Sequence, residues 1–287
     1  MTATQFAEPL RVPFGRTGRS VPVIGQGTWT MERDARAAIR ALRRGLDLGL
    51  EHIDTAEIYG GGAVERLVGR ALRGVRERAF LVSKVDPARA SRAGTVRACE
   101  ESLRRLRTDH LDAYLLHWAG PHPLEETFEA FETLVAQGKI RCWGVSNFDE
   151  TLLAQARHIA GDRIACNQVM YHLRQRTVEH AVLPYCCRHD IAIVGYSPFG
   201  AGTFAGADVE GARLLSMIAA CHDATPRQVA LAFLARCGRA LLIPRTVKLA
   251  HVAENGRAAT LRLYPEEIAA LDRAFPVTAH TGGVPLW

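Results

Sequence analysis

The sequence predicts an α/β fold, a (β/α)8 TIM barrel that forms a single domain. From Val21 onward, short apolar runs rich in β-branched residues alternate with longer segments of helical period. Eight such units can be counted, the number that closes a parallel barrel. The length of 287 residues is one that α/β barrels fill as one domain. We therefore expect one barrel domain over residues 1–287.

Eight strands are expected, each followed by a helical segment. They lie near residues 23–26, 51–55, 79–84, 111–117, 140–145, 164–168, 191–196 and 240–244. Before the first of them, residues 10–22 contain Gly15 and Gly18 between short apolar stretches. This segment predicts a small β-hairpin that closes the barrel floor.

Two helices carry clear sequence signals. Thr225 precedes Pro226 in the pattern of an N-cap followed by a first-turn proline, and Gly238 marks the end of that segment. Residues 95–106 are amphipathic, with one apolar face. That face comprises Val96, Cys99, Leu103 and Leu106.

Composition narrows the class of protein. Hydrophobic residues make up 48% and charged residues 23%, as in ordinary folded domains. The net charge of +6 comes from scattered Lys and Arg without a basic run, so we expect no nucleic-acid partner, although the field would favour an anionic ligand. No apolar run approaches the ~20 residues that span a bilayer, and the N-terminus lacks an export signal. We expect no membrane association.

The seven cysteines show no CxxC spacing, which argues against a disulfide framework or a zinc site. A reducing cytoplasm is the expected location. Cys186 and Cys187 are adjacent and could form a redox pair, but neighbouring cysteines seldom bridge, and the alternative is an ordinary helix end.

Polar residues stand at three successive strand ends, where barrel enzymes place their chemistry. Asp54 ends the second strand, and Tyr59 follows five residues later, just before Gly60, Gly61 and Gly62. Lys84 ends the third strand inside an apolar run, where an ammonium group needs a carboxylate partner such as Asp54. His117 ends the fourth strand.

A tyrosine beside a buried Lys–Asp pair has a chemical use. The lysine charge is expected to lower the phenol pKa from its ordinary ~10 towards neutrality, so that Tyr59 can donate a proton. His117 would then hydrogen-bond the substrate oxygen or assist the transfer. A carbonyl group would fit between them.

Several motifs, in this order, resemble the signatures of the aldo-keto reductase superfamily nearly from end to end. They are HIDTAEIYG at 52–60, VSK at 82–84, LLHW at 115–118, GVSNF at 144–148, NQVMYH at 167–172, YSPFG at 196–200 and IPRT at 243–246. QGTW at 26–29 is similar to the family's first barrel loop.

The resemblance implies an NAD(P)H-dependent carbonyl reductase and assigns roles. Tyr59 would be the proton donor, tuned by Lys84 and Asp54, while His117 orients the carbonyl. The implied cofactor contacts are Thr28, Trp29, Ser146, Asn147, Gln168, Tyr196, Ser197, Phe199, Gly200, Arg245, Thr246, Val247, His251, Glu254 and Asn255. Within this set, Ser146, Asn147 and Gln168 would hold the nicotinamide carboxamide, and Tyr196 would stack beneath the ring.

The phosphate end departs from the best-known family pattern. His251 stands where an arginine often clasps the 2′-phosphate, and Arg245 and Thr246 replace lysine and serine. Because Arg245 can grip a phosphate with two donors and Lys248 is near, we expect NADPH, with NADH possible.

Trp29 and Trp118 resemble the aromatic walls of the substrate pocket, and the tail after Phe275 is short. A small-molecule carbonyl is therefore expected, such as a small aldehyde or a dicarbonyl, and the sequence resembles the bacterial methylglyoxal-reductase branch. The family implies that a monomer is enough.

Two other classes remain open on the residues alone. His52 and Asp54 lie two apart on one strand, as in metal-dependent barrel hydrolases, although the later strand ends offer poor metal ligands and we expect no metal. A non-catalytic cofactor-binding regulatory subunit is the other alternative.

Overall fold

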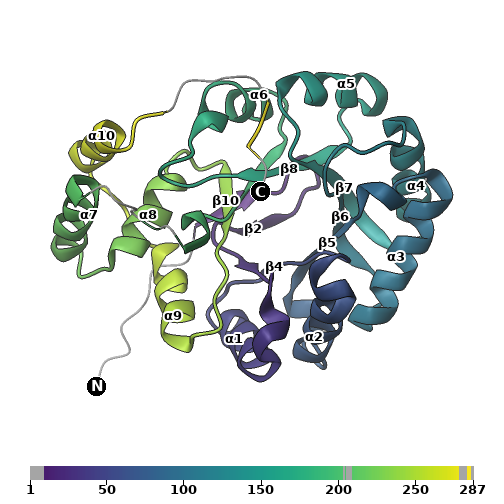
Figure 1. Ribbon diagram of the computed structural model, residues 1–287, viewed down its shortest axis with the longest axis horizontal. Coiled ribbons are helices and arrows are strands. Elements are labelled where there is room, and N and C mark those ends of the chain that lie inside the picture. Colours follow the sequence, from purple (N-terminus) through teal and green to yellow (C-terminus); the bar gives the residue numbers. More distant parts are fainter. Residues whose placement is uncertain (1–9, 203, 205–208, 278–282, 286–287) are drawn as a thin grey trace.

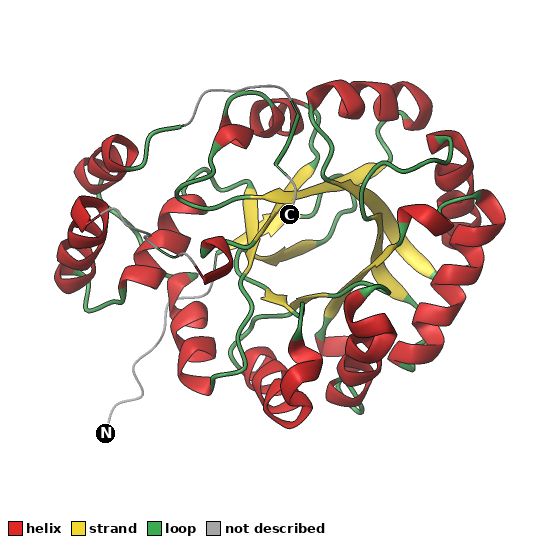
Figure 2. Ribbon diagram, viewed as in Figure 1, coloured by secondary structure: helices red, strands yellow, loops and turns green. Residues whose placement is uncertain are grey.

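Eight parallel strands curve around a central axis inside a ring of helices (Figures 1 and 2). The computed structural model describes residues 10–202, 204, 209–277 and 283–285. The strands run in chain order around the sheet: β3 (Gln26–Gly27), β4 (His52–Asp54), β5 (Phe80–Val85), β6 (Leu111–Leu116), β7 (Ile140–Ser146), β8 (Ile164–Met170), β9 (Ala192–Tyr196) and β10 (Ala240–Ile243). The expected (β/α)8 barrel is confirmed.

Backbone hydrogen bonds join the first and last strands and close the barrel. Gly25 N donates to Leu242 O at 2.7 Å, and Gly27 N donates to Pro244 O at 3.1 Å. Glycine is needed at position 27 because a Cβ atom there would stand 2.6 Å from the carbonyl oxygen of Ile243. The close approach of these backbones makes the sheet continuous.

Ten α-helices are described. They are α1 (Ala35–Asp47), α2 (Ala63–Ala71), α3 (Arg92–Leu106), α4 (Leu124–Ala136), α5 (Glu150–Ala160), α6 (Val182–Arg188), α7 (Val209–Cys221), α8 (Pro226–Leu234), α9 (Leu249–Ala258) and α10 (Pro265–Ala274). The last strand connection holds two helices, α7 and α8, where the sequence predicted one. Among the described residues, no helix has both the length and the apolar character to cross a membrane.

The first strand differs most from its prediction. It was expected at 23–26, but the regular pairing covers only Gln26 and Gly27, and Ile24 contributes a single bridge to Leu242. Gly25 passes close to β4, where a Cβ would lie 2.7 Å from His52 O, so only glycine fits there. The other seven predicted strands differ from the observed ones by a residue or two at their ends.

The predicted start of the helix after Thr225 is confirmed, whereas its end is not: α8 ends at Leu234, before Gly238. The Thr225 side chain accepts the amide of Gln228, whose own side chain accepts the amide of Thr225, and Pro226 opens α8. The amphipathic segment 95–106 belongs to α3, which begins earlier, at Arg92, because Ser91 caps it. Its predicted apolar face points inward, with Val96 half-buried and the other three residues buried.

The predicted floor hairpin is also confirmed. Strand β1 (Arg11–Pro13) pairs antiparallel with β2 (Ser20–Pro22). Phe14, in the turn between them, is fully buried, with its ring 4.6 Å from that of Phe80 and 6.1 Å from that of His52. The hairpin thus seals the end of the barrel opposite the carboxyl ends of the strands.

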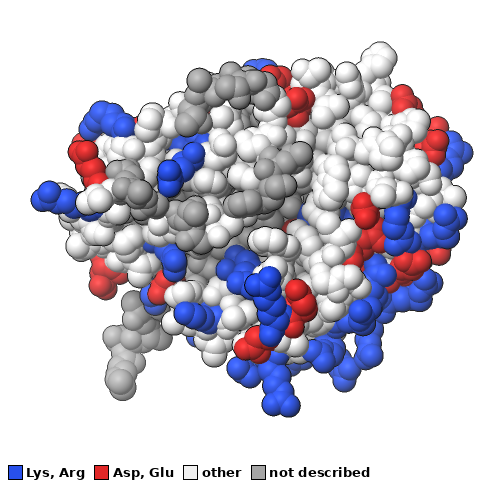
Figure 3. All heavy atoms as spheres, in the orientation of Figure 1, with Lys and Arg blue, Asp and Glu red and all other residues white. Residues whose placement is uncertain are grey.

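Positive charge gathers on one side of the outer ring, over α1, α2 and α3 (Figure 3). Arg36, Arg40, Arg66, Arg70 and Arg104 are among the exposed side chains there. The charges are scattered along the sequence, but helical spacing and helix–helix packing bring them to one face. That surface lies outside the barrel mouth.

Candidate active site

Three strand ends bring Asp54, Lys84 and His117 to the mouth of the barrel. Asp54 ends β4, Lys84 is the penultimate residue of β5, and His117 follows β6 directly. These three strands are neighbours in the sheet, and all three side chains are at least nine-tenths buried. Parallel pairing places their carboxyl ends together, as the sequence predicted.

Asp54 and Lys84 form the expected ion pair. Lys84 Nζ donates to Asp54 Oδ1 at 2.6 Å and to Thr55 O at 2.8 Å. The second carboxylate oxygen, Oδ2, accepts Gln168 Nε2 at 2.7 Å. Burial acts against the charge of Lys84, but Asp54 and Tyr59 outweigh it, so the pKa of Lys84 lies above its ordinary value. Lys84 is therefore a permanent cation at neutral pH.

Tyr59 lies beside this pair, at the start of the short 3-10 turn η2 (Tyr59–Gly62). Its ring centroid is 5.2 Å from Lys84 Nζ and 5.8 Å from the ring of His117. Gly60, Gly61 and Gly62 follow, with φ angles of 54°, 56° and 82° in the left-handed region that favours glycine. These glycines reverse the chain direction directly after Tyr59, so the phenol stays at the barrel mouth.

The predicted fall in the phenol pKa is wrong. Burial raises the pKa of Tyr59 above 10, while the charge of Lys84 and its hydrogen bond to the phenol only partly offset that rise. The free-energy cost of burying a phenolate exceeds its stabilisation by Lys84, because Asp54 neutralises much of the Lys84 charge. Tyr59 is thus a neutral phenol, able to donate a proton.

His117 is an uncharged imidazole. Burial and the charge of Lys84 lower its pKa to about 2. Its Nδ1 is buried and has no hydrogen-bond partner among the described residues. A neutral imidazole can orient a carbonyl oxygen through a hydrogen bond, but it does not hold the additional proton of an imidazolium at neutral pH.

The expected carboxamide residues lie together beside this group. A register shift between β7 and β8 sets Ser146 opposite Gln168, and Ser146 Oγ donates to Gln168 O at 2.9 Å. Asn147, with a φ of 64°, follows β7 and donates through Nδ2 to His117 O at 3.0 Å. The Tyr196 hydroxyl donates to Asn147 Oδ1 at 3.0 Å. These contacts fix four polar side chains around one face of the mouth.

The residues expected at the phosphate end lie on the loops that follow β9 and β10 and on α9. Arg245 is exposed and donates to Trp29 O at 3.1 Å and to Thr30 Oγ1 at 2.7 Å. Thr246 Oγ1 accepts the amide of Lys248, which precedes α9. Val247, His251 and Glu254 are partly buried, and Asn255 is buried, on or just before that helix.

On the β9 side, Ser197 and Gly200 both have positive φ angles, 52° and 60°. The amide of Gly200 donates to Ser197 O at 2.8 Å, which forms a tight turn. Phe199 in this turn has the guanidinium of Arg227 5.4 Å from its ring centroid. This loop therefore combines a tight turn with a cation close to its aromatic ring.

The two predicted pocket tryptophans are exposed at the rim. Trp29 is 53% exposed and Trp118 is 37% exposed, and the Trp118 ring lies 4.8 Å from that of His117. Thr28 is buried, and its hydroxyl donates to Asp54 O at 2.8 Å. Thr28 thus supports the backbone of Asp54, and its predicted contact with the cofactor stays a prediction.

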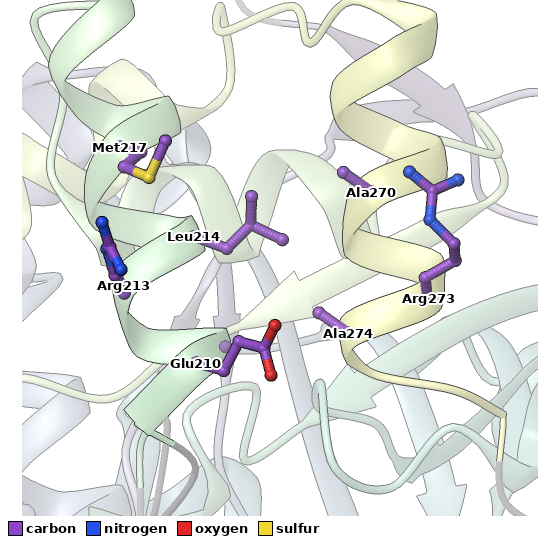
Figure 4. A pocket seen from close by; sticks show the side chains of 8 residues that line it. Glu210, Arg213, Leu214, Met217, Ala270, Arg273 and Ala274 are labelled. Atoms are coloured by element: carbon purple, nitrogen blue, oxygen red, sulfur yellow. The ribbon is translucent and has the colours of Figure 1, made fainter.

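Other candidate features lie apart from the mouth. A groove of about 580 Å³ runs between α7 and α10, where Leu214 points toward Ala270 (Figure 4). None of the predicted site residues lines it. Cys186 and Cys187 are free thiols in the last turns of α6, and burial raises the pKa of each, which opposes redox reactivity.

Sequence reasoning missed the side chains that hold these groups in place. The bond from Gln168 to Asp54 and the buried carboxylates of Glu57 and Glu65 were not anticipated. The sequence offered one weak signal, since Glu65 lies between the apolar residues Val64 and Leu67 of α2. A charged residue in that position indicates a buried carboxylate. No group of three His, Cys, Asp or Glu side chains suited to a metal ion occurs among the residues described.

Comparison with known proteins agrees with this geometry. The family model described as "Aldo/keto reductase family" matches residues 23–275. Methylglyoxal reductase YeaE of Escherichia coli (strain K12) is 44% identical over 262 residues, 90% of this chain and 92% of the relative. Pyridoxine 4-dehydrogenase of the same organism is 33% identical, over 88% of this chain and 92% of the relative.

Solved structures extend the likeness to three dimensions. An aldo/keto reductase from Klebsiella pneumoniae, in complex with NADP and acetate, has a TM-score of 0.91 at 42% identity and covers 96% of this chain and 99% of its own. An aldo-keto reductase from the same organism, in complex with NADPH, also has a TM-score of 0.91, at 41% identity, covering 98% of this chain and all of its own.

Barrel and strand-end residues together define a nicotinamide-dependent oxidoreductase on a (β/α)8 scaffold. The chain belongs to the aldo/keto reductase family. The predicted class of enzyme, a carbonyl reductase, is thereby confirmed, and NADP or NADPH is the cofactor held by both structural relatives. The metal-dependent hydrolase is disfavoured by the same assignment.

Proposed function

We propose that this protein reduces small aldehydes and 1,2-dicarbonyls such as methylglyoxal with NADPH. The observation that carries the proposal is the convergence of a neutral phenol, a permanent cation and an uncharged imidazole at one barrel mouth: Tyr59, Lys84 and His117. Bound NADPH supplies the hydride for the carbonyl carbon.

The chain's own residues manage the developing negative charge on the carbonyl oxygen. Tyr59 donates its hydroxyl proton to that oxygen, and Lys84 stabilises the phenolate left behind. Asp54 holds Lys84 in place through the 2.6 Å ion pair. His117 orients the oxygen as a hydrogen-bond partner, which suits its neutral state.

The mouth also suits the cofactor. Ser146, Asn147 and Gln168 present amide and hydroxyl groups where a carboxamide needs donors and acceptors. At the other end, α9 begins after Lys248 without a side-chain cap in this described segment, so its first amides remain available to a phosphate. The exposed cations Arg245 and Lys248 support NADPH over NADH.

The identity of the substrate rests on two kinds of support. The E. coli relative at 44% identity is named for methylglyoxal reduction. Trp29 and Trp118 offer apolar walls to a small carbonyl compound.

All the proposed catalytic groups come from one chain, so a monomer is sufficient for activity. The cysteines have no CxxC spacing, which is consistent with a reducing cytoplasm as the location.

Turnover by the purified protein tests the proposal. NADPH oxidation with methylglyoxal and a panel of aldehydes is followed by absorbance, with and without a chelator. We expect turnover that the chelator leaves unchanged. No turnover on any compound would sink the enzyme proposal, and activity lost with the chelator would refute the hydride mechanism without a metal.

Tyr59→Phe tests the proton donor. We expect a loss of roughly 100-fold or more in kcat, the usual scale of general acid catalysis. NADPH affinity, measured by fluorescence titration, should stay nearly intact because the ring remains. Unchanged turnover would refute the role of Tyr59.

A further inference from the structure

A cluster of buried charges lies behind the loop that carries Tyr59, facing α3. The side chain of Glu65 on α2 is fully buried, that of Glu57 is 5% exposed, and that of Arg105 on α3 is 18% exposed. Burying carboxylates is costly, and such groups are best explained when they fix a particular arrangement of the chain. The mechanism above uses none of these three residues.

Glu65 joins α2 to β5 and α3. Its Oε1 accepts Ser83 Oγ at 2.6 Å, and its Oε2 accepts Arg105 Nε at 2.5 Å. Ser83 is the residue before Lys84 on β5. One carboxylate therefore ties the strand that delivers Lys84 to the helix that follows the Tyr59 loop.

Glu57 makes the corresponding tie on the other side of Lys84. Its Oε1 accepts the backbone amide of Asp86 at 2.7 Å, and its Oε2 lies 2.5 Å from Arg89 Nη1 and 3.8 Å from Arg105 Nη2. Asp86 comes two residues after Lys84, and Glu57 two residues before Tyr59.

These bonds bracket both catalytic residues in the sequence. Ser83 and Asp86 flank Lys84, while Glu57 and Glu65 flank the turn that begins at Tyr59. Arg105 contacts both carboxylates. The segment that carries Tyr59 and the strand that carries Lys84 are thus joined both before and after these two residues.

The loop needs such ties because its own backbone is permissive. Three consecutive glycines follow Tyr59, and glycine loses more conformational freedom on ordering than any other residue. The space a Cβ of Gly62 would need is filled by Arg105, whose Cδ would be 2.7 Å away. Arg105 therefore also packs directly against the end of this turn.

We propose that Glu57, Glu65 and Arg105 form a clamp that positions Tyr59 against Lys84, so that Arg105 on the outer helix ring acts as a positioning residue for carbonyl reduction. The inference rests on the proposed function above. Small displacements of an acid from its reacting atom cost much in rate, so loosening the clamp lowers kcat more than it weakens binding.

Arg105→Met tests the clamp, since it keeps the apolar stem and removes the cation. We expect kcat with methylglyoxal to fall by roughly tenfold or more, with the substrate KM and the NADPH Kd within about twofold of wild type. Arg104→Met is the matched control, because Arg104 is the adjacent, exposed residue of α3. It should behave as wild type.

Rescue separates positioning from general stability. Arg105→Lys keeps a cation but cannot reach both carboxylates with a planar fork, so it should recover part of kcat. Guanidinium ion at millimolar concentration should likewise raise the kcat of Arg105→Ala and leave that of Arg105→Met unchanged. If Arg105→Met does not fold, Glu57→Gln replaces it: the amide oxygen still accepts the Asp86 amide, the ion pairs are lost, and kcat should fall.

A readout without turnover keeps the two proposals apart. In protein with ¹³Cζ-labelled tyrosine, the Tyr59 resonance is identified by its absence in Tyr59→Phe. We expect it to shift in Arg105→Met and not in Arg104→Met, while the Tyr264 resonance stays in place. An unmoved resonance, or a kcat within twofold of wild type, overturns the clamp. Absence of wild-type turnover would overturn the proposed function. The shift of the Tyr59 resonance in Arg105→Met would still test the clamp.

Discussion

Individual residues at the barrel mouth owe their chemistry to their neighbours. Lys84 keeps its proton because Asp54 and Tyr59 outweigh burial, and His117 loses its proton because burial and Lys84 act together. Tyr59 feels both influences, and burial prevails. Burial, together with the Lys84–Asp54 pair, therefore leaves an uncharged phenol, an uncharged imidazole and an ion pair side by side.

Arg245 carries the residue-scale prediction about the cofactor. Arg245→Ala should weaken NADPH binding roughly tenfold, the scale of a charge-assisted hydrogen bond to phosphate, and weaken NADH binding much less. The dissociation constants of both cofactors, measured by fluorescence titration, check this. Because Arg245 also holds the backbone of Trp29 and Thr30, a modest loss common to both cofactors is expected. Equal losses would mean that the 2′-phosphate is recognised elsewhere.

At the scale of elements, the end of each strand positions a side chain of the site, and neighbouring strands and helices hold that side chain in place. The register shift between β7 and β8 is one example, since it sets Gln168 opposite Ser146 and within reach of Asp54. Helix α8 is another. Its buried Gln228 closes the capping box with Thr225 and donates to Glu254 O of α9, so α8 supports the helix at the expected phosphate end.

Thr225→Ala gives the prediction at this scale. It removes the hydroxyl that accepts the Gln228 amide and should lower the free energy of unfolding by about 1 kcal/mol. Urea unfolding would show a lower midpoint at an unchanged slope. Thr225→Ser, which keeps the hydroxyl, should stay within a few tenths of a kcal/mol of wild type. Equal midpoints for both variants would show that the cap contributes nothing.

At the scale of the whole molecule, the barrel has a chemical end and a sealed end. The hairpin brings Phe14 against His52 and Phe80 at the floor, and both ring nitrogens of His52 lack partners among the described residues. Burial lowers the pKa of His52 to about 4, more than the nearby carboxylates of Asp54 and Asp112 can offset, and the charge of Lys84 adds to the fall.

His52 therefore predicts a loss of stability in acid. Its pKa is about 4 in the folded protein and 6.5 when solvated, so between these values the unfolded chain binds the proton first. Stability falls as the pH drops from 6.5 to 4, by about 3 kcal/mol from this group. His52→Leu should flatten that decline in urea unfolding, and the same change at exposed His158 should not. An equally steep decline in His52→Leu would contradict this origin.

The sequence alone determined the scaffold and the identity of the chemical groups. The alternation of short apolar runs with segments of helical period predicted the eight repeated units, and the ends of the predicted strands identified Asp54, Lys84 and His117. These inferences succeed because parallel strands always bring their carboxyl ends to one face. The cap at Thr225 and the floor hairpin were readable for a similar reason, since both depend on residues close in the chain.

Only the tertiary structure decided how those groups behave. The direction of the Tyr59 pKa depends on how completely the phenol is buried and how fully Asp54 neutralises Lys84, neither of which is a local property. The bond from Gln168 to Asp54 spans 114 residues, and the tie from Glu65 to Arg105 spans 40. Desolvation and long-range hydrogen bonds arise from packing, so the pattern of residue types predicted the site while the fold set its acidity and its supports.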